Sequence, residues 1–417
     1  MQEVLLSIKL AARNLKSNKG RTILTLVGIV IGITAVIVIS SSGQGVKSFV
    51  LGQIESFGTD LIQVEVKVPS TEHMSSANAG AQAMGVNITT LTVDDAEAIG
   101  KLPNIDGFYA GTIGQELVNY QNINKRIMLF GAGASAPNLD PNIKLDSGNF
   151  YTDADDRSLA PVAVIGYDIK KSLFGESDAV GQTIKIRGKN FNVIGVLAKR
   201  GTVSFFNFDE IIYIPVRTLE KKILGVDYIK MISVKMSNPS LETQTVADIT
   251  DLLARRHNTP SPEKYDFGVT SIKEAQKTIA DVFGTINILL LVITSISLLV
   301  GGVGIMNVMY VAVTERTFEI GLRKAVGAKP ADILKQFLIE AIFVTFTGGV
   351  VGIILGFLLS LILSYFFKFL GFDLKFSITL NSLLIATSFS AAVGIIFGYY
   401  PARKAASLSP MEALRRE

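Results

Sequence analysis

Four long stretches of this chain contain no charged residue. They cover residues 22–46, 282–314, 341–367 and 376–402, which are 25, 33, 27 and 27 positions. A helix needs about 20 apolar residues to cross the hydrocarbon core of a bilayer. We therefore predict a membrane protein with four transmembrane helices, one before and three after a long intervening segment. The 33-residue stretch is longer than a membrane requires, so its helix is expected to tilt or to project beyond the bilayer.

The first stretch also has a feature of a secretory signal peptide, namely a preceding basic segment. The basic residues are Lys9, Arg13, Lys16, Lys19 and Arg21. The apolar region of a signal peptide is about 7–15 residues long, whereas this stretch has 25. An uncleaved first helix is therefore the favoured interpretation, and a cleaved signal peptide is the alternative.

Basic residues are concentrated in three of the segments that flank the predicted helices. Five Lys or Arg lie in residues 1–21, five in 315–340 and four in 403–417, but only two lie between the third and fourth helices. Cytoplasmic connections carry the excess of basic residues in membrane proteins. We therefore expect a multi-pass protein of the cytoplasmic (inner) membrane, with both termini and residues 315–340 in the cytoplasm.

Residues 47–281 then form an extracytoplasmic domain, which is long enough to bury a core of its own as two subdomains. Thr92 precedes two aspartates and predicts a helix start, and a second helix is predicted over Leu241 to His257. Alternating and β-branched runs predict strands over residues 61–66, 126–130, 162–165, 183–187, 191–197, 211–214 and 232–236. This mixture predicts an α+β fold. The Ser-, Ala- and Gly-rich segment from Pro69 to Asn87 predicts a mobile loop.

Patterns for catalysis or metal binding are missing from the sequence. The chain has no Cys and two His, which excludes disulfides and thiol catalysis and disfavours a His-rich metal site. No G-x-x-x-x-G-K-[ST] loop occurs, so no nucleotide site is predicted in this chain. The acidic run Asp153, Asp155, Asp156 is interpreted as a solvated turn, because a calcium loop needs more oxygen ligands. His257 is expected to complement the dipole at a helix end.

We therefore predict no catalytic residue and no metal, and the net charge of +4 is too small to indicate a nucleic-acid partner. Within the predicted helices, small residues recur at helical spacing, where they allow close packing inside the bundle or across a dimer interface. These residues are Gly28, Gly32, Gly348, Gly352, Gly356, Gly394 and Gly398. Asn287 and Asn307 are expected to form hydrogen bonds across helices in the lipid environment.

Residues 315–340 combine a charged face with an apolar stripe. Glu315, Glu319 and Arg323 are spaced four residues apart, and Glu319 precedes Arg323 in the favourable orientation for an ion pair. The apolar stripe consists of Phe318, Leu322 and Ala325. Gly327 is expected to end this helix, and a second short helix is predicted to begin at residues 329–332. Such a segment is suited to docking on another protein, and a solvated extension of the second membrane helix is the equal alternative.

At this segment the sequence resembles the MacB/FtsX family of ABC transporter permeases. The motif consists of Glu315-Arg316, Glu319-Ile320-Gly321, Arg323-Lys324-Ala325, Gly327-Ala328, Asp332-Ile333-Leu334 and Gln336 through Ala341. Three more stretches are similar to the family: Arg21-Thr22 with Gly28 and Gly32, Val180-Gly181-Gln182-Thr183-Ile184 before Phe191 through Val196, and Tyr400 through Ala406 before Pro410 through Arg415. The resemblance covers essentially the whole chain.

This resemblance implies a non-catalytic permease that works as a dimer of two permease copies, expected to be identical chains. It implies a separate ABC ATPase subunit, which binds ATP and Mg²⁺ in trans and moves the extracytoplasmic domains. An extracytoplasmic adaptor protein is a further expected partner. The residues that would couple to the ATPase are Glu315, Arg316, Glu319, Gly321, Arg323, Lys324, Gly327 and Ala328.

The expected function is ATP-driven export or efflux. Two alternatives share the same layout and stay open at this point. One is a permease that releases lipoproteins, and the other is an FtsX-like transducer that transports nothing and activates an extracellular enzyme.

Overall fold

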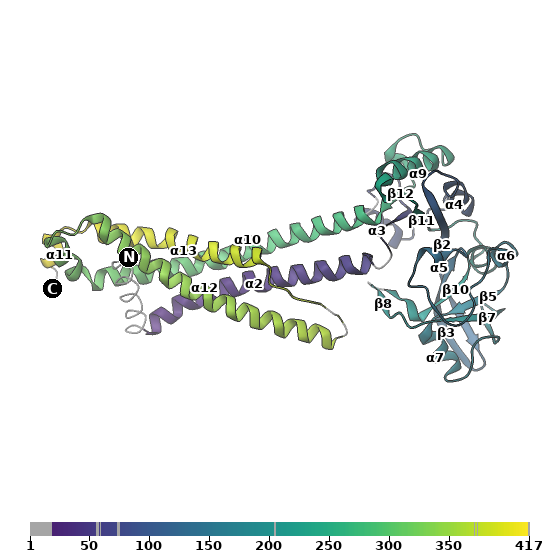
Figure 1. Ribbon diagram of the computed structural model, residues 1–417, viewed down its shortest axis with the longest axis horizontal. Coiled ribbons are helices and arrows are strands. Elements are labelled where there is room, and N and C mark those ends of the chain that lie inside the picture. Colours follow the sequence, from purple (N-terminus) through teal and green to yellow (C-terminus); the bar gives the residue numbers. More distant parts are fainter. Residues whose placement is uncertain are drawn as a thin grey trace. The chain divides into compact units, whose positions relative to one another are not determined.

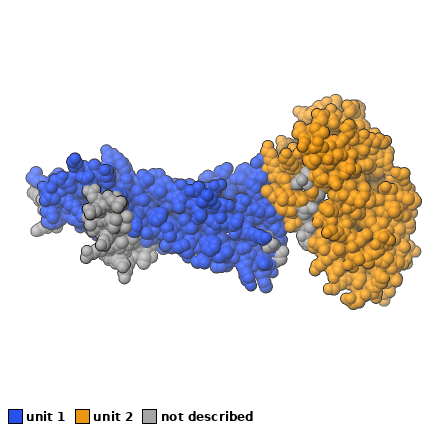
Figure 2. Space-filling model, in the orientation of Figure 1, with its two compact units in different colours: residues 1–49, 279–417 blue, residues 50–278 orange. Residues whose placement is uncertain are grey.

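The computed structural model describes residues 19–415 except 56, 57, 59, 73–75, 204, 205, 371 and 373. The chain forms two compact units, which Figure 2 shows in different colours. One unit, here called the bundle, comprises residues 1–49 and 279–417, and the other, here called the inserted domain, comprises residues 50–278. Most of the basic N-terminal segment predicted to be cytoplasmic lies outside the described residues.

Four helices in the described part of the chain are long and apolar enough to cross a membrane. They are α2 (Lys19–Glu55), α10 (Ile272–Glu315), α12 (Pro330–Phe369) and α13 (Leu380–Ser407), drawn as long coils in Figure 1. The predicted layout of one helix, an inserted domain and three further helices is confirmed. Helices α2, α10 and α12 extend beyond their charge-free stretches at both ends, whereas α13 begins four residues into its stretch and extends past its end. Helix α10, with 44 residues, is about 66 Å long at 1.5 Å per residue.

Two short helices complete the bundle, α11 (Thr317–Ala325) and α14 (Pro410–Arg415). The second short helix predicted at residues 329–332 is not separate, because it is the first turn of α12. Pro330 occupies the first helical position, and the backbone N–H of Lys329 donates to Asp332 Oδ2 at 3.1 Å. No Gly or Pro interrupts residues 331–347, so the helix continues into the membrane-spanning part.

Glycines bring the bundle helices into backbone contact. Gly28 of α2 faces Gly301 of α10 so closely that a Cβ at Gly28 would lie 2.9 Å from the Gly301 Cα. On α12, Gly352 packs against Ile33 and the backbone of Val30, and its carbonyl oxygen accepts a hydrogen bond from Thr34 Oγ1 at 3.0 Å. The other predicted glycines also face helices of this chain: Gly32 meets Leu298, Gly348 meets Ile29, Gly356 meets Ile37, Gly394 meets Thr345 and Gly398 meets Ala341.

Among the residues that the structure describes, neither asparagine forms the predicted hydrogen bond across helices. The side-chain oxygen of Asn287 is buried facing Gly43 and accepts no hydrogen bond from the residues that the structure describes. Asn307 is exposed on α10. Small hydroxyls form such bonds instead, because they reach a neighbouring backbone carbonyl where the helices are close. Besides Thr34, Ser390 Oγ donates to the Thr345 carbonyl at 2.7 Å.

The inserted domain is built on a ten-stranded mixed sheet with the order β12-β1-β11-β2-β3-β10-β5-β7-β4, and β6 pairs with β2 and β7. The strands are β1 (Leu61–Val66), β2 (Ile105–Tyr120), β3 (Ile123–Ala132), β4 (Leu145–Gly148), β5 (Val162–Ile165), β6 (Thr183–Ile186), β7 (Lys189–Leu197), β10 (Ile211–Pro215), β11 (Met231–Met236) and β12 (Phe267–Ser271). A separate hairpin pairs β8 (Thr202–Val203) with β9 (Phe206–Asn207). Two pairs are parallel, β3 with β10 and β5 with β7. The predicted α+β class is confirmed.

Two main cores lie along this sheet and define two lobes. In the first lobe, α4 (Val93–Ile99) and α9 (Glu242–Arg256) pack on β1, β11 and β12 around Ile62, Ile232 and Leu253. In the second lobe, α7 (Tyr167–Phe174) packs with β3, β5, β7 and β10 around Leu129 and Phe191. Further helices in the described part of this domain include α5 (Ala136–Leu139), α6 (Asp153–Arg157), α8 (Val216–Thr218) and a π-helical turn over Leu219–Leu224.

Strand β2 joins the two lobes, and the sequence did not predict it. Its first half pairs with β11 of the first lobe and its second half with β3. Three glycines within it argue against a strand by composition. In the structure they make room for side chains of neighbouring elements, since Gly107 lies against Leu139, Gly111 against Met231 and Gly114 against Leu224.

The predicted mobile loop between Pro69 and Asn87 is wrong in part, because helix α3 (Ser76–Ala83) lies within it. Four alanines, the strongest helix formers, account for this helix. Asn78 on the helix is buried, and its Oδ1 accepts a hydrogen bond from the Val68 backbone at 2.9 Å. The predicted start of α4 is confirmed, with Thr92 as N-cap residue and its backbone N–H donating to Asp95 Oδ2 at 2.9 Å.

His257 follows α9 as predicted, but its role is an ion pair rather than a dipole contact. Its Nδ1 lies 2.8 Å from Asp266 Oδ1 and its Nε2 lies 3.4 Å from Asp95 Oδ2. Burial by itself would lower the pKa of His257. Hydrogen bonds to the two carboxylates outweigh burial and raise this pKa to about 9. The imidazolium therefore links α4, α9 and the start of β12.

We predict that close packing at Gly352 is required for bundle stability. A Cβ there would lie 2.8 Å from the Ile33 Cβ and 3.0 Å from the Val30 carbonyl oxygen, so Gly352→Leu must push α12 away from α2. The expected destabilisation is roughly 1–3 kcal/mol or more, measured by thermal unfolding in detergent. Gly284→Leu is the matched control, because nothing lies within 4 Å of a Cβ at that position. Equal stability of the two variants would show that α12 does not pack closely against α2 at Gly352.

A second prediction concerns the pH dependence of the inserted domain. The pKa of His257 is raised in the folded state from 6.5 to about 9. The protonated imidazole therefore stabilises the folded domain fully below about pH 6.5, and this stabilisation is lost as the pH rises through 9. The wild type should therefore lose up to about 3 kcal/mol of stability relative to His257→Gln between pH 6 and pH 9.5. Chemical denaturation at both pH values measures this difference. Parallel pH profiles for the two proteins would show that the imidazolium is not held by Asp95 and Asp266.

Candidate functional site

Helix α11 lies between α10 and α12 in the chain, and non-helical residues separate it from both helices. Arg316 separates it from the end of α10. Gly327 follows its C-terminal end with φ of +102°, a conformation that glycine adopts without strain. Lys329 and Pro330 then start α12. The helix ends at Ala325, two residues before the predicted stop at Gly327.

The basic residues predicted to couple to a partner are engaged inside the chain. Arg323 Nη2 lies 2.6 Å from Glu319 Oε1, and its Nη1 donates to Gln336 Oε1 of α12 at 2.6 Å. Arg316 Nη1 lies 3.3 Å from an oxygen of Glu340, whose side chain is 5% exposed. These contacts tie both ends of α11 to the first turns of α12.

Lys324 makes a third attachment, to the C-terminal end of α13. Its ammonium group donates to the backbone carbonyl of Leu408 at 2.6 Å and to that of Ala406. Carbonyl groups at a helix C-terminus carry a partial negative charge and favour a cation. Helix α14 also packs against α11. The charged side chains therefore hold α11 in one orientation.

The inward face of α11 is formed by Thr317, Ile320 and Gly321, which are buried against the bundle. The outward face is apolar. Phe318, Leu322 and Val326 are 59%, 52% and 81% exposed and follow one another at intervals of four residues. We call these three residues the α11 stripe.

The structure thus divides the eight predicted coupling residues into groups. Arg316, Arg323 and Lys324 contact other parts of this chain, and Glu319 lies exposed beside Arg323. Gly321 is buried, Gly327 is exposed and Ala328 packs partly against the bundle core. Glu315 is exposed at the end of α10. Sequence reasoning included Phe318 and Leu322 in an apolar stripe but missed Val326, which continues the same four-residue spacing.

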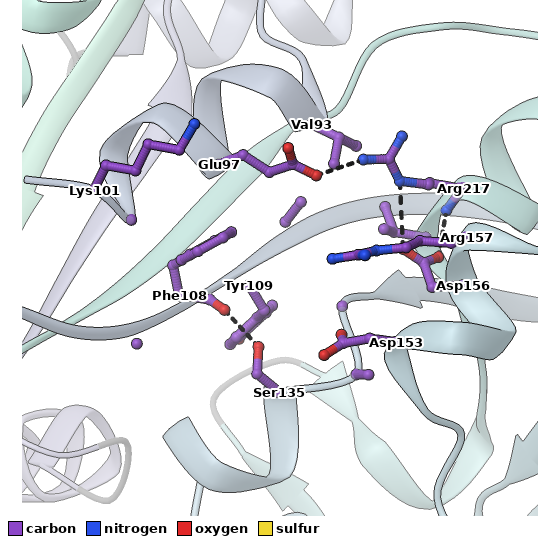
Figure 3. A pocket seen from close by; sticks show the side chains of 16 residues that line it. Val93, Glu97, Lys101, Phe108, Tyr109, Ser135, Asp153, Asp156, Arg157 and Arg217 are labelled. Carbon is purple, nitrogen blue, oxygen red and sulfur yellow. Dashed lines mark hydrogen bonds and ion pairs between the residues drawn. The ribbon is translucent and has the colours of Figure 1, made fainter.

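The acidic run Asp153, Asp155, Asp156 is not the predicted solvated turn, because it forms the first turn of helix α6 and Asp156 is buried. Asp155 Oδ2 accepts hydrogen bonds from the backbone N–H of Thr152 at 2.8 Å and from its hydroxyl at 2.7 Å, which caps α6. Asp156 pairs with Arg217 (Figure 3). Over the described residues, no group of three or more His, Asp or Glu side chains is arranged to hold a metal ion.

Two family models match the chain over most of its length. The MacB-like periplasmic core domain matches residues 22–252, and the FtsX-like permease C-terminal region matches residues 291–410, which include α11. The chain belongs to the MacB/FtsX family of ABC transporter permeases. The family resemblance seen in the sequence motifs is confirmed.

Curated relatives include two proteins named macrolide export ATP-binding/permease protein MacB. The one from Wolinella succinogenes is 36% identical over 416 residues, and the one from Chlorobium phaeobacteroides is 37% identical over 408 residues. The matches cover 100% and 98% of this chain but 61% and 60% of the relatives. The chain therefore spans about three fifths of the length of these MacB proteins.

Among solved structures, the periplasmic region of MacB from Actinobacillus actinomycetemcomitans is similar at a TM-score of 0.46 and 23% identity. The match covers 54% of this chain and 95% of that structure.

Proposed function

We propose that this MacB/FtsX-type permease is the transmembrane subunit of an ABC transporter that drives export or efflux, and that a cytoplasmic ABC ATPase docks on the α11 stripe. The observation that carries the proposal is the exposure of Phe318, Leu322 and Val326 on a helix whose charged residues are bound within the chain. An apolar surface held rigidly loses little conformational entropy when a partner covers it.

Helix α10 is the element that would carry motion from this docking site. It ends at Glu315, one residue before Arg316 and α11, and it begins at Ile272, directly after β12. Its first turn is fixed to the first lobe, because Ser271 Oγ accepts from the Glu274 backbone N–H at 3.0 Å and donates to Glu242 of α9. A displacement of α11 would therefore reach the inserted domain through one continuous helix.

ATP and Mg²⁺ belong to the partner in this proposal, and the chain itself is a non-catalytic subunit. The ATPase acts in trans, and a second, identical permease copy and an extracytoplasmic adaptor protein complete the assembly. The proposed location is the cytoplasmic membrane, with both termini and α11 on the cytoplasmic side. The fourteen basic residues in residues 1–21, 315–340 and 403–417 support this orientation. The names of the curated relatives support export over lipoprotein release.

We predict that Leu322→Asp separates the permease from its ATPase. A buried charge in the centre of an interface costs more than about 2 kcal/mol, which corresponds to an affinity loss of about 30-fold. The measurement is the amount of ABC ATPase retained when the tagged chain is purified in detergent, together with the ATP hydrolysis of the retained complex. Both should fall, while the variant still folds and inserts.

Met411→Asp is the matched control, because Met411 is an exposed apolar residue on α14, outside the stripe. It should retain the ATPase. If Leu322→Asp keeps wild-type amounts of ATPase and wild-type hydrolysis, α11 is a solvated connection and the docking proposal is wrong.

A further inference from the structure

The last turns of α12 extend beyond the helix that packs against it. Gly394 of α13 meets Thr345 of α12, and the two helices run antiparallel (Figure 1). Leu380, where α13 begins, is fourteen residues before Gly394, so it lies at the level of residue 359 of α12. Residues 360–369 of α12 therefore have no turn of α13 beside them.

The inner side of this helix end is held by the segment that follows it. Ser364 Oγ donates a hydrogen bond to the Leu374 carbonyl at 2.9 Å. The rings of Phe367 and Phe376 lie 5.8 Å apart in an edge-to-face arrangement, and the ring of Phe376 also lies against Gly45 of α2. These contacts fix the rotation of α12 about its axis, so its opposite side faces outward.

The outward side of α12 changes from aliphatic to aromatic along its length. Leu358, Leu361 and Ile362 are exposed, and they are followed by Tyr365 and Phe369, which are 79% and 84% exposed. At 3.6 residues per turn, these five side chains lie within a sector of about 100° around the helix. Aromatic side chains at the end of a membrane helix lie at the level of the lipid head groups. The change therefore places the boundary between hydrocarbon and head groups near Tyr365.

A lysine lies on the same outward side. Lys368 follows Tyr365 by three residues and is exposed. It forms no ion pair and no side-chain hydrogen bond with the residues that the structure describes. No Asp or Glu occurs in the sequence between Glu340 and Asp373, and Asp373 lies outside the described residues. The ammonium group of Lys368 is therefore available to an anion at the level of the head groups.

We propose that the outward side of this helix end binds an anionic phospholipid. The lipid phosphate contacts the Lys368 ammonium group, and the glycerol and the upper part of the acyl chains pack on the rings of Tyr365 and Phe369. An anionic head group is favoured over a zwitterionic one, because the zwitterion brings a cation of its own to the phosphate. The site is at the end of α12 away from α11, so it does not depend on ATPase docking.

The depth of this site can be measured with a single tryptophan, because the chain contains none. Phe369→Trp is made in the full-length chain and reconstituted into phosphatidylcholine bilayers that contain a nitroxide-labelled lipid. A nitroxide on the head group should quench the fluorescence of this variant more strongly than a nitroxide at the end of the acyl chain. Leu358→Trp is the control on the same side of α12, about 16 Å deeper, and should show the reverse order.

Head-group selectivity is measured with Phe369→Trp and brominated lipids, which quench on contact. Brominated phosphatidylglycerol should associate about fivefold more strongly than brominated phosphatidylcholine, the effect of one basic residue at a lipid surface. Adding Lys368→Gln should remove this preference. Lys335→Gln, which changes an exposed lysine near the other end of α12, should leave it unchanged. Tyr365→Trp provides a second probe one turn away and should report the same selectivity.

Four outcomes would each overturn the proposal. Two concern depth: stronger quenching of Phe369→Trp by the acyl-chain nitroxide, or no quenching by either nitroxide. The other two concern the head group: equal association of the two brominated lipids, or a preference for phosphatidylglycerol that survives Lys368→Gln.

Discussion

The backbone contact between Gly28 of α2 and Gly301 of α10 is the constraint on which the bundle depends. Lipid chains are as apolar as the helix surfaces, so no hydrophobic force drives these helices together. Close van der Waals contact must supply the association, and glycine allows it. Gly352 allows the same close contact between α12 and α2, and its carbonyl oxygen also accepts a hydrogen bond from the Thr34 hydroxyl. Helix α10 is thereby held against α2 while its two ends reach α11 and the inserted domain.

The charged side chains of α11 orient the helix, and its exposed apolar side chains form the surface on which we propose that a partner docks. Arg316 and Arg323 attach α11 to α12, and Lys324 attaches it to carbonyl groups at the C-terminal end of α13. A partner that pulls or pushes on the α11 stripe would therefore act on the whole bundle. The basic residues predicted to couple to an ATPase thus have partners inside the chain, and their role in coupling stays a prediction.

The sequence predicted the features that depend on local pattern. Charge-free length identified the four helices, and the Thr92 and Gly327 signals marked a helix start and stop. The missed features depend on partners far away in sequence. Glycines in β2 are needed because the side chains of Met231 and Leu224 pack directly against the strand. Arg316 contacts Glu340, which lies twenty-four residues further along the chain. For Arg323, the neighbour Glu319 was predicted from spacing, but Gln336 on the next helix could not be.

The most direct test of ATPase docking on α11 is site-specific photo-crosslinking in intact cells. Benzoylphenylalanine in place of Phe318 keeps an aromatic side chain within the stripe, and the same substitution at Phe357, exposed on the membrane-spanning part of α12, provides the comparison. The account predicts a light-dependent adduct between this chain and an ABC ATPase from position 318 and none from position 357. If position 318 gives no ATPase adduct, or if both positions crosslink only to lipid, the α11 stripe is not the docking surface.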